Sequence, residues 1–425
     1  MSEQPRPRAH RPWGSLRHSV LRLKPARRLI DRVRDRFELP AAARAERDRD
    51  ARGLAEHEDP GLDRVIAEGI EWIGRAQDHS ATADGGVARH YSLVGGWGPS
   101  YPETTGYIVP TLLQYAERSG EASARERARR MLDWFVKIQM PGGGFQGGTI
   151  DAAPVVPVTF NTGQILIGLA AGVRAFDEYR EQTIAAADWL VATMDSDGCW
   201  RKHPTPFARV GEKTYETHVA WGLFEADRVI PGRDYGAAGL RNVGWALTHQ
   251  QSNGWFARCC LTDPTQPLTH TIGYVLRGVI EGYRFGGDAA LLQAAQRTAD
   301  GVLTALQPDG FLPGRLNSDW KGAVPWVCLT GTAQIAHCWL LLFRETGDAR
   351  YRDAAFAALR YVRRTVRIGG SPEIRGAVKG SFPISGDYGR YEYLNWACKF
   401  LVDACMLEQE IRAVEGAETV AAAIS

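Results

Sequence analysis

The chain has 425 residues, a hydrophobic fraction of 44%, a charged fraction of 24% and a formal net charge of +2. These proportions are ordinary for a globular protein, and because no run of 18 apolar residues occurs, a transmembrane helix is not expected. Seven cysteines, an odd number in a long chain, argue against a disulfide framework. The sequence has neither a CxxC nor an HExxH motif, which argues against a dedicated zinc site. We therefore expect a cytoplasmic protein that needs no metal and no cofactor.

The positive charge is concentrated at the N-terminus. Residues 1–37 carry 11 Lys and Arg against 3 Asp and Glu, whereas the remainder carries 40 against 46. A mildly acidic body of this kind argues against nucleic acid as the ligand. Within the basic part, residues 14–37 place apolar side chains among arginines at helical spacing. A helix with this pattern can lie on an anionic membrane surface or dock on a partner, but a solvated arm that partly packs on the domain is the favoured interpretation.

From residue 61 onward, two kinds of helix alternate. Amphipathic charged segments are predicted at 61–79, 122–140, 180–195, 235–251, 288–306 and 348–367. Segments that are apolar nearly all round are predicted at 104–118, 161–177, 217–229, 271–285, 330–345 and 392–408. A helix that is apolar on every side must be buried on every side, so the pattern predicts an inner ring of six helices within an outer ring of six. The predicted fold class is an all-α (α/α)6 toroid at 61–410, preceded by an arm and linker at 1–60 and followed by a tail at 411–425.

A short motif with a threonine begins each inner helix. The motif threonines are 54 to 59 residues apart, and we count them as Thr104, Thr162, Thr217, Thr271 and Thr330, with a degenerate last copy at 391–396. A fixed period of this length is the signature of a repeat architecture. Each motif is preceded by a glycine turn and a long loop, whereas the connections from inner to outer helices are short. Because long loops in compact domains are usually functional, we expect the active site on the face where the inner helices begin.

Two carboxylates stand at equivalent motif positions, Glu103 in Tyr-Pro-Glu-Thr and Glu216 in Tyr-Glu-Thr. Two carboxyl groups in one cavity can divide into acid and base when their environments separate their pKa values. The alternative is that each caps its helix by accepting from backbone N–H groups. Asp319 in the fifth long loop is a third acid or base candidate, with a turn residue as the alternative. His270 at a motif start is a candidate base for removing a proton next to a carboxylate.

Further residues are predicted to bind substrate around the same mouth. Aromatic side chains offer stacking faces for sugar rings, and basic or polar side chains hold hydroxyl or carboxylate groups. The predicted substrate-binding residues are His90, Tyr91, Trp97, Tyr101, Tyr215, His218, Arg315, Trp320, Arg375, Lys379, Asp387 and Tyr388. For Arg375 and Lys379 the alternative is a solvated rim charge. Tyr215, Tyr274 and Tyr388 are also candidate partner acids.

Six repeated motifs with long loops on one side resemble the six-hairpin glycosidase-like superfamily. This superfamily includes unsaturated glucuronyl hydrolases, sugar 2-epimerases, toroid polysaccharide lyases and the helical domain of glucuronyl C5-epimerases. The stretches Tyr-Pro-Glu-Thr-Thr-Gly-Tyr and Tyr-Leu-Asn-Trp-Ala-Cys-Lys-Phe look like a bacterial group associated with surface-polysaccharide assembly. Terpene cyclases share the outline, but this chain lacks their Asp-rich DxDD or DDxxD runs. The resemblance implies an oligosaccharide or polysaccharide substrate and carries over no residue role.

Three functions stay open at this point. The first is a glycoside hydrolase-like enzyme acting by acid/base chemistry on a glycan that contains uronic acid. The second is a polysaccharide lyase or uronyl C5-epimerase of the same fold, using His or Tyr. The third is a non-catalytic scaffold that binds a glycan or a lipid-linked intermediate at the membrane through residues 14–37. The gathering of carboxylates, histidines and aromatic residues at one mouth favours an enzyme.

Overall fold

The computed structural model describes residues 39–424 apart from 56 and 207, and side chains as far as residue 417. The basic stretch 14–37, and with it the predicted membrane contact, lies outside the described residues. Within them, no helix combines the length and the apolarity that crossing a bilayer requires. All seven cysteines are buried free thiols.

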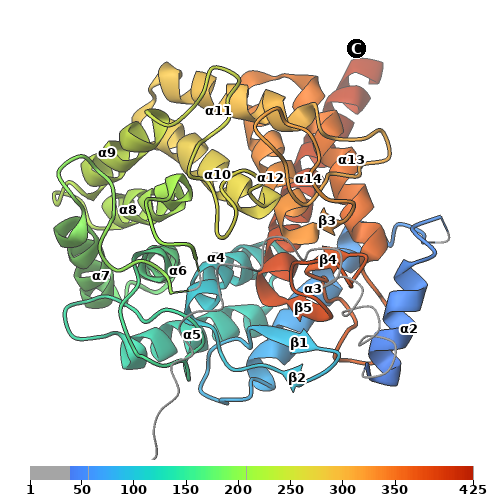
Figure 1. Ribbon diagram of the computed structural model, residues 1–425, viewed down its shortest axis with the longest axis horizontal. Helices are drawn as coiled ribbons and strands as arrows, with labels where there is room; N and C mark the ends of the chain where they lie inside the picture. The colour runs from blue at the N-terminus through green and yellow to red at the C-terminus, as the bar shows by residue number, and fades with distance from the viewer. Residues whose placement is uncertain (1–38, 56, 207, 425) are drawn as a thin grey trace, which may run out of the picture.

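Twelve of the described helices form two concentric rings (Figure 1). The outer ring consists of α3 (Leu62–Asp78), α5 (Ala122–Ile138), α7 (Arg180–Thr193), α9 (Tyr235–Leu247), α11 (Ala289–Leu303) and α13 (Ala349–Thr365). The inner ring consists of α4 (Pro102–Ser119), α6 (Thr159–Phe176), α8 (Thr217–Val229), α10 (Thr269–Gly286), α12 (Leu329–Thr346) and α14 (Asn395–Ile424). Each inner helix packs on the next, and α14 packs on α4, which closes the ring. The predicted all-α (α/α)6 toroid is confirmed.

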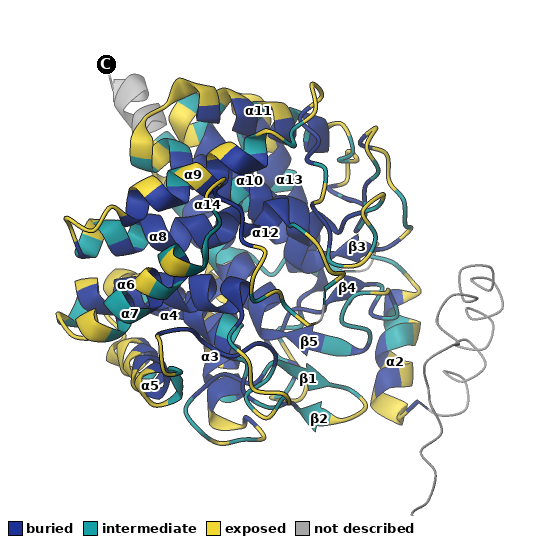
Figure 2. Cartoon of the chain, turned by 60° about the vertical axis from the view of Figure 1, so that its left-hand side comes forward, coloured by how far each residue is buried: buried dark blue, intermediate teal, exposed yellow. Residues whose placement is uncertain are grey.

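Burial separates the two rings as the sequence pattern predicts (Figure 2). In α6 every residue from Thr159 to Val173 is buried, because this helix has neighbours on all sides. In α13 the buried positions recur every three or four residues, as in Tyr351, Ala354, Ala358 and Val362, and the charged positions between them face outward.

Glycines allow the inner helices to approach backbone to backbone. A Cβ placed on Gly222 of α8 would lie 2.5 Å from the carbonyl oxygen of Gly163 in α6. A Cβ placed on Gly168 of α6 would lie 2.3 Å from the carbonyl oxygen of Gly106 in α4. Since real Cβ atoms are not found this close to backbone, these positions fix the spacing of neighbouring inner helices.

The long loops lie together at the N-terminal ends of the inner helices, where short strands connect them. Strand β1 (His90–Ser92) of the first loop pairs with β2 (Gly96–Trp97) and with β5 (Glu392–Leu394) of the last loop. Strand β3 (Val327–Cys328) pairs with β4 (Ser381–Phe382). The ring of helices is closed by the contact of α14 with α4, and the ring of loops at the mouth is closed by the pairing of β1 with β5.

The motif threonines attach loops to helices and do not cap them. Thr105 Oγ1 accepts from the Val87 N–H and donates to the Tyr101 carbonyl, and Thr162 Oγ1 accepts from the Phe145 N–H and donates to the Val158 carbonyl. The residue equivalent to Thr162 is therefore Thr105, not Thr104 as counted from the sequence.

Helix α2 (Ala41–Asp50) lies outside the rings, within the arm and linker predicted at 1–60. It is held by buried ion pairs, since Glu46 and Asp50 of α2 contact Lys379 at 2.7 and 2.5 Å. At the other end of the chain, α14 continues to Ile424, through the boundary expected at residue 410.

Candidate active site

Glu103 lies in the first turn of α4 and is half-buried. The Tyr101 hydroxyl donates a hydrogen bond of 2.9 Å to its Oε2 atom. Burial raises the pKa of the Glu103 carboxyl to about 7, while the Tyr101 hydroxyl and Arg89 favour the ionised form and oppose this rise. No side chain caps the N-terminus of α4, so capping does not account for this carboxylate.

Glu216 directly precedes α8, in a 3-10 turn spanning Thr214–Glu216. Only 6% of the residue is exposed, and its Oε2 atom has no hydrogen-bond partner among the described residues. Burial raises the pKa of this carboxyl to about 8, and the nearby Lys213 only partly opposes the rise. Here too no cap hydrogen bond from the side chain is formed. A carboxyl that stays protonated near neutral pH is suited to act as a general acid.

A belt of aromatic rings connects the two carboxylates. The Tyr101 ring lies 6.0 Å from Trp396, whose indole N–H donates to the Tyr388 hydroxyl at 2.9 Å. The belt continues through His270, Tyr274, Phe160 and Tyr215, with successive ring centroids 5.6, 4.4, 5.0 and 5.4 Å apart, counted from Tyr388. The pKa of the Tyr215 phenol is raised well above its ordinary value by burial and then by Glu216 and Glu103. Both carboxyl groups therefore act on one phenol.

Two histidines flank Tyr274 within this belt. The His218 and His270 rings lie 4.5 and 4.4 Å from the Tyr274 ring. Each Nδ1 lies 2.6 Å from a glutamine Oε1, His218 from Gln164 and His270 from Gln334. Since the glutamine oxygen accepts, the Nδ1 atoms carry the protons, and Nε2 is an acceptor in the neutral rings. Burial lowers the pKa of His270 to about 4 and that of His218 well below its ordinary value.

Several buried polar atoms of this region have no hydrogen-bond partner within the described part of the chain. They are Asn161 Nδ2, Gln164 Nε2, Tyr215 Oη, Glu216 Oε2, His218 Nε2 and Gln334 Nε2. Buried polar groups are nearly always paired, and an unpaired one costs about 1–3 kcal/mol. Their concentration makes this region the candidate binding site for a polar ligand. We call these residues, with Tyr101, Glu103, Tyr274, His270 and Tyr388, the axial cluster.

Positive charge lies beside the axial cluster, on Lys399. Lys399 of α14 is 1% exposed, pairs with Asp403 at 2.7 Å, and its ammonium lies over the Phe400 and Tyr107 rings. Burial lowers the pKa of Lys399, and Asp403 opposes this. Lys399 also contributes, after burial and Arg277, to the low pKa of His218. An anionic group on a ligand would meet an attractive potential here.

The fifth loop does not contribute to the cluster. Asp319 is exposed, and its N–H donates to the Asn317 side chain, so it serves as a turn residue. Trp320 is 6% exposed, and its ring packs 5.2 Å from Trp255. The prediction that Trp320 stacks on a sugar is therefore wrong, because its face is covered by the core. Arg315 is half-buried and donates to the Gln266 carbonyl.

The last loop contributes Tyr388 alone. The prediction that Lys379 binds a substrate anion at the mouth is wrong, since its ammonium is 1% exposed and is neutralised by Glu46 and Asp50. Arg375 pairs with Glu68 of α3 at 3.0 Å. Asp387 is exposed.

The first loop forms the rim next to Tyr101. His90 is half-buried near Arg89 and Glu392, and the Arg89 guanidinium lies 5.3 Å from the Trp396 ring centroid. Tyr91 and Trp97 pack against each other at 5.1 Å. The first loop therefore borders the axial cluster through Arg89 and does not enter it.

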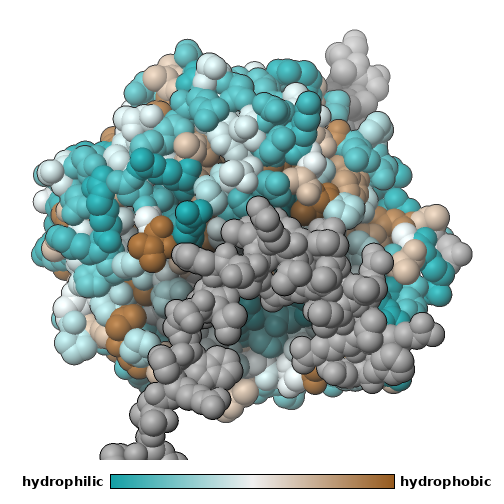
Figure 3. All heavy atoms as spheres, in the orientation of Figure 1, coloured by the Kyte–Doolittle hydropathy of each residue, from teal (hydrophilic) through white to brown (hydrophobic). Residues whose placement is uncertain are grey.

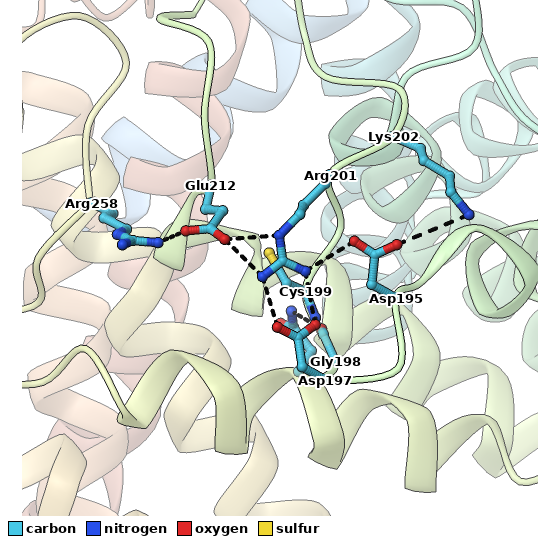
Figure 4. A network of polar contacts seen from close by, with 9 residues as sticks. Asp195, Asp197, Gly198, Cys199, Arg201, Lys202, Glu212 and Arg258 are labelled. Atoms are coloured by element: carbon cyan, nitrogen blue, oxygen red, sulfur yellow. Dashed lines mark hydrogen bonds and ion pairs between the residues drawn. The ribbon is translucent and has the colours of Figure 1, made fainter.

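An ion network supports the loop that carries Glu216 (Figure 4). Arg201 contacts Asp195, Asp197 and Glu212 at 3.0, 2.7 and 2.7 Å, and Arg258 also pairs with Glu212. Glu212, which lies four residues before Glu216, thus links the glycine turn at Asp197 and Gly198 to the loop that carries Arg258. These contacts orient the segment that presents the buried carboxyl.

Sequence reasoning missed Gln164, Gln334, Asn161 and Lys399. The motif held a signal for the first two, because each glutamine stands two residues after a motif threonine when the fifth copy is aligned on Thr332. No comparable signal marks Lys399, which lies in an apolar helix.

No protein-family model matches the sequence, and no curated protein matches it. Solved structures with the same fold include an unsaturated glucuronyl hydrolase specific for heparin, at 15% identity and a TM-score of 0.66, covering 83% of this chain and 98% of that one. A D-mannose isomerase has 11% identity and a TM-score of 0.66, covering 82% and 97%. An unsaturated glucuronyl hydrolase from Bacillus sp. GL1, responsible for degrading glycosaminoglycan, has 15% identity and a TM-score of 0.63, covering 81% and 96%. At these identities the likeness is one of fold.

Proposed function

We propose that this protein is a carbohydrate-active enzyme that hydrolyses a glycan containing uronic acid. Its (α/α)6 toroid fold is that of the six-hairpin glycosidase-like superfamily. The observation that carries the proposal is the buried Glu216 carboxyl, whose free oxygen shares an aromatic-lined cluster with a second carboxyl, Glu103. Carbohydrate-processing enzymes among the structures of the same fold support the substrate class.

The two carboxyls take different roles in this proposal. Glu216, with a pKa of about 8, donates its proton to the glycosidic oxygen as the bond to the leaving sugar breaks. Glu103, with a pKa of about 7 and a hydrogen bond from Tyr101, is the base that accepts a proton from the attacking water. Rings such as Tyr101 and Tyr388 give stacking faces, and the unpaired amides and imidazoles of the axial cluster hold sugar hydroxyls.

The uronate assignment follows from charge. After burial, Arg277 and Lys399 lower the pKa of His218, so their positive charge acts on the cluster although Glu281 and Asp403 pair with them. A sugar carboxylate placed there gains a charge-assisted interaction that a neutral sugar lacks.

One observation favours a second chemistry, elimination or C5-epimerisation. Tyr274 stands between two neutral imidazoles, an arrangement that can move a proton to or from the carbon next to a uronate carboxylate. This alternative needs no Glu216 acid, so the two chemistries make different demands on the same cluster.

Incubation with uronic-acid and neutral oligosaccharides in deuterated water, followed by mass spectrometry, separates the possibilities. Cleavage with addition of water is the expected result. Cleavage without water would identify a lyase, a one-dalton gain without cleavage would identify an epimerase, and sugar binding without turnover would favour the scaffold.

The matched variants are Glu103→Gln and Glu216→Gln, with Glu126→Gln on the exposed face of α5 as the control. We expect each of the first two to lower kcat/KM by about 10²–10⁴-fold, the usual contribution of a general acid or base, and the control to leave it unchanged. Full activity of Glu216→Gln would refute the hydrolytic mechanism.

A further inference from the structure

A cavity lies between α2 and the rim of the toroid, away from the axial cluster. Its volume is 310 Å³, at the lower end of the range for small-molecule sites, which suits one sugar unit or a compound of that size. Its lining comes from α2, the first loop and the segment after α13, and consists of Ala42, Ala45, Glu46, Arg49, Arg52, Tyr91, Leu93, Arg367, Ser371 and Ile374.

Among the described residues of this lining, the one acid is already neutralised. Glu46 contacts Lys379 at 2.7 Å and Arg367 at 2.9 Å, and these two cations hold the pKa of Glu46 below its ordinary value although burial raises it. Asp50 also forms an ion pair with Lys379, at 2.5 Å, and its side chain accepts a hydrogen bond from the Ile384 N–H. We call Glu46, Asp50, Lys379 and Arg367 the α2 ion cluster. Its two negative and two positive charges balance.

Two further arginines of the lining are left without a counter-charge. Neither Arg49 nor Arg52 forms an ion pair with any residue that the structure describes, and the buried Arg49 Nε atom has no hydrogen-bond partner there. A guanidinium is always charged near neutral pH, and a buried donor without a partner is costly. The cavity therefore carries an excess charge of about +2 beside the apolar surfaces of Leu93 and Ile374.

We propose that this cavity binds the oxyanion group, carboxylate or phosphate, of a ligand about the size of one sugar. Guanidinium groups match the geometry of both oxyanions. The Tyr91 ring and the aliphatic side chains would contact the body of the ligand.

This site is separate from the axial cluster. None of its lining residues belongs to that cluster. Around the grey atoms of Figure 3 the visible face is mainly hydrophilic, with apolar residues in small separate patches. The proposal concerns the charged cavity and does not depend on the glycan chemistry of the axial cluster.

Isothermal titration of the full chain with sodium phosphate and with sodium glucuronate tests the proposal, with glucose as the neutral control. We expect wild-type protein to bind at least one of the two anions and not glucose. Binding of phosphate alone would identify a phosphorylated ligand. Binding of glucuronate alone would identify a carboxylated sugar if Arg49→Gln/Arg52→Gln weakens it, because glucuronate bound in the axial cluster would not respond to that variant. Binding of neither anion would overturn the proposal.

The double variant Arg49→Gln/Arg52→Gln should bind the anion at least about tenfold more weakly, because a hydrogen bond to a charged group contributes that much or more. The double variant Arg44→Gln/Arg241→Gln removes the same charge from exposed positions outside the cavity and should bind as wild type does. Equal weakening in both pairs, or unchanged binding in the first, would contradict the site. Glu103→Gln should retain anion binding, which keeps this result distinct from loss of glycan turnover.

Chemical labelling of the wild-type protein makes the test independent of variant folding. Phenylglyoxal modifies accessible arginines, and mass spectrometry locates the products. A saturating concentration of the bound anion should slow modification of Arg52 relative to the exposed Arg44. Equal rates at both positions with and without the anion would contradict the proposal.

Discussion

Glu103 is half-buried and Glu216 is buried in the toroid, and neighbouring groups stabilise their charged forms to different extents. The ionised form of Glu103 is favoured by the hydrogen bond from the Tyr101 hydroxyl and by the nearby Arg89. The ionised form of Glu216 is favoured only by the nearby Lys213. The resulting pKa values, about 7 and about 8, leave Glu103 ionised and Glu216 protonated between these pH values.

This difference predicts a bell-shaped dependence of kcat/KM on pH. Activity should rise as Glu103 loses its proton near pH 7 and fall as Glu216 loses its proton near pH 8. Initial rates should be measured from below pH 7 to above pH 8, with the oligosaccharide that the incubation experiment identifies as a substrate. The Glu126→Gln control should give the same profile, and a rate independent of pH from well below the first value to well above the second would contradict the assignment.

The same pKa shift predicts that Glu216 costs stability at alkaline pH. Below the ordinary pKa of 4.5 the carboxyl is protonated in both the folded and unfolded states, so it has no effect. As pH rises toward about 8, only the unfolded chain ionises, and folding is disfavoured by on the order of 3–5 kcal/mol. Glu216→Gln should therefore raise the free energy of unfolding at pH 8 and change it little near pH 4.5.

Urea unfolding at the two pH values measures the effect directly. The exposed control Glu126→Gln should show the same small effect at both. A gain for Glu216→Gln that does not depend on pH would mean that the carboxyl has an ordinary pKa.

At the scale of the element, α2 is held in place by charge as well as by packing. Glu46 and Asp50, one turn apart, reach Lys379 in the last long loop, and the Ile384 N–H donates to Asp50. A second connection follows directly in the chain, where Asp59 accepts from Arg363 of α13 in a bidentate pair. The segment before the toroid is thus attached to the loop that carries Tyr388.

Lys379→Met should lower the free energy of unfolding by about 3–5 kcal/mol, because it leaves buried carboxylates without their shared cation. Lys321→Met, at an exposed position, is the matched control and should have little effect. Adding Asp50→Asn to Lys379→Met should recover part of the loss, since the unpaired charge is then removed. A loss below about 1 kcal/mol for the single variant would show that the pair is not important for stability.

At the scale of the whole molecule, the spacing of the inner helices sets the diameter of the inner ring, around whose axis the cluster is built. That spacing depends on glycines such as Gly106, Gly163, Gly168 and Gly222, which face the backbone of the next helix. A side chain at such a position would push two helices apart and displace residues of the axial cluster on both.

Gly222→Ala should therefore destabilise the protein by about 1–3 kcal/mol or more through overpacking. Gly244→Ala in α9 is the matched control, because nothing lies within 4 Å of the added Cβ. There alanine should stabilise the helix by roughly 0.5–1 kcal/mol. Thermal unfolding of both variants would settle the comparison, and a neutral Gly222→Ala would show that the ring can widen at little cost.

Much of the fold was predictable because the periodicity of apolar residues records how many sides of a helix are covered. The alternation of fully apolar and amphipathic segments specified both rings and the face on which the loops meet. The pairing of the motif threonines was less accessible, since the hydrogen bond from Val87 to Thr105 distinguishes Thr105 from Thr104. Glu103 and Glu216 could be singled out as candidates because they directly precede inner helices, whose starting points the pattern also marks.

The sequence by itself therefore determined the architecture and which two carboxylates stand at the helix starts. Tertiary structure alone decided which charges are free and which aromatic faces are open. Lys379 and Asp50 lie 329 positions apart, and only folding shows that they neutralise each other. Trp320 is buried by Trp255, and Gln164 and Gln334 each contact a histidine on a neighbouring helix. Contacts of this kind depend on side chains that meet across the ring, and local periodicity carries no information about such partners.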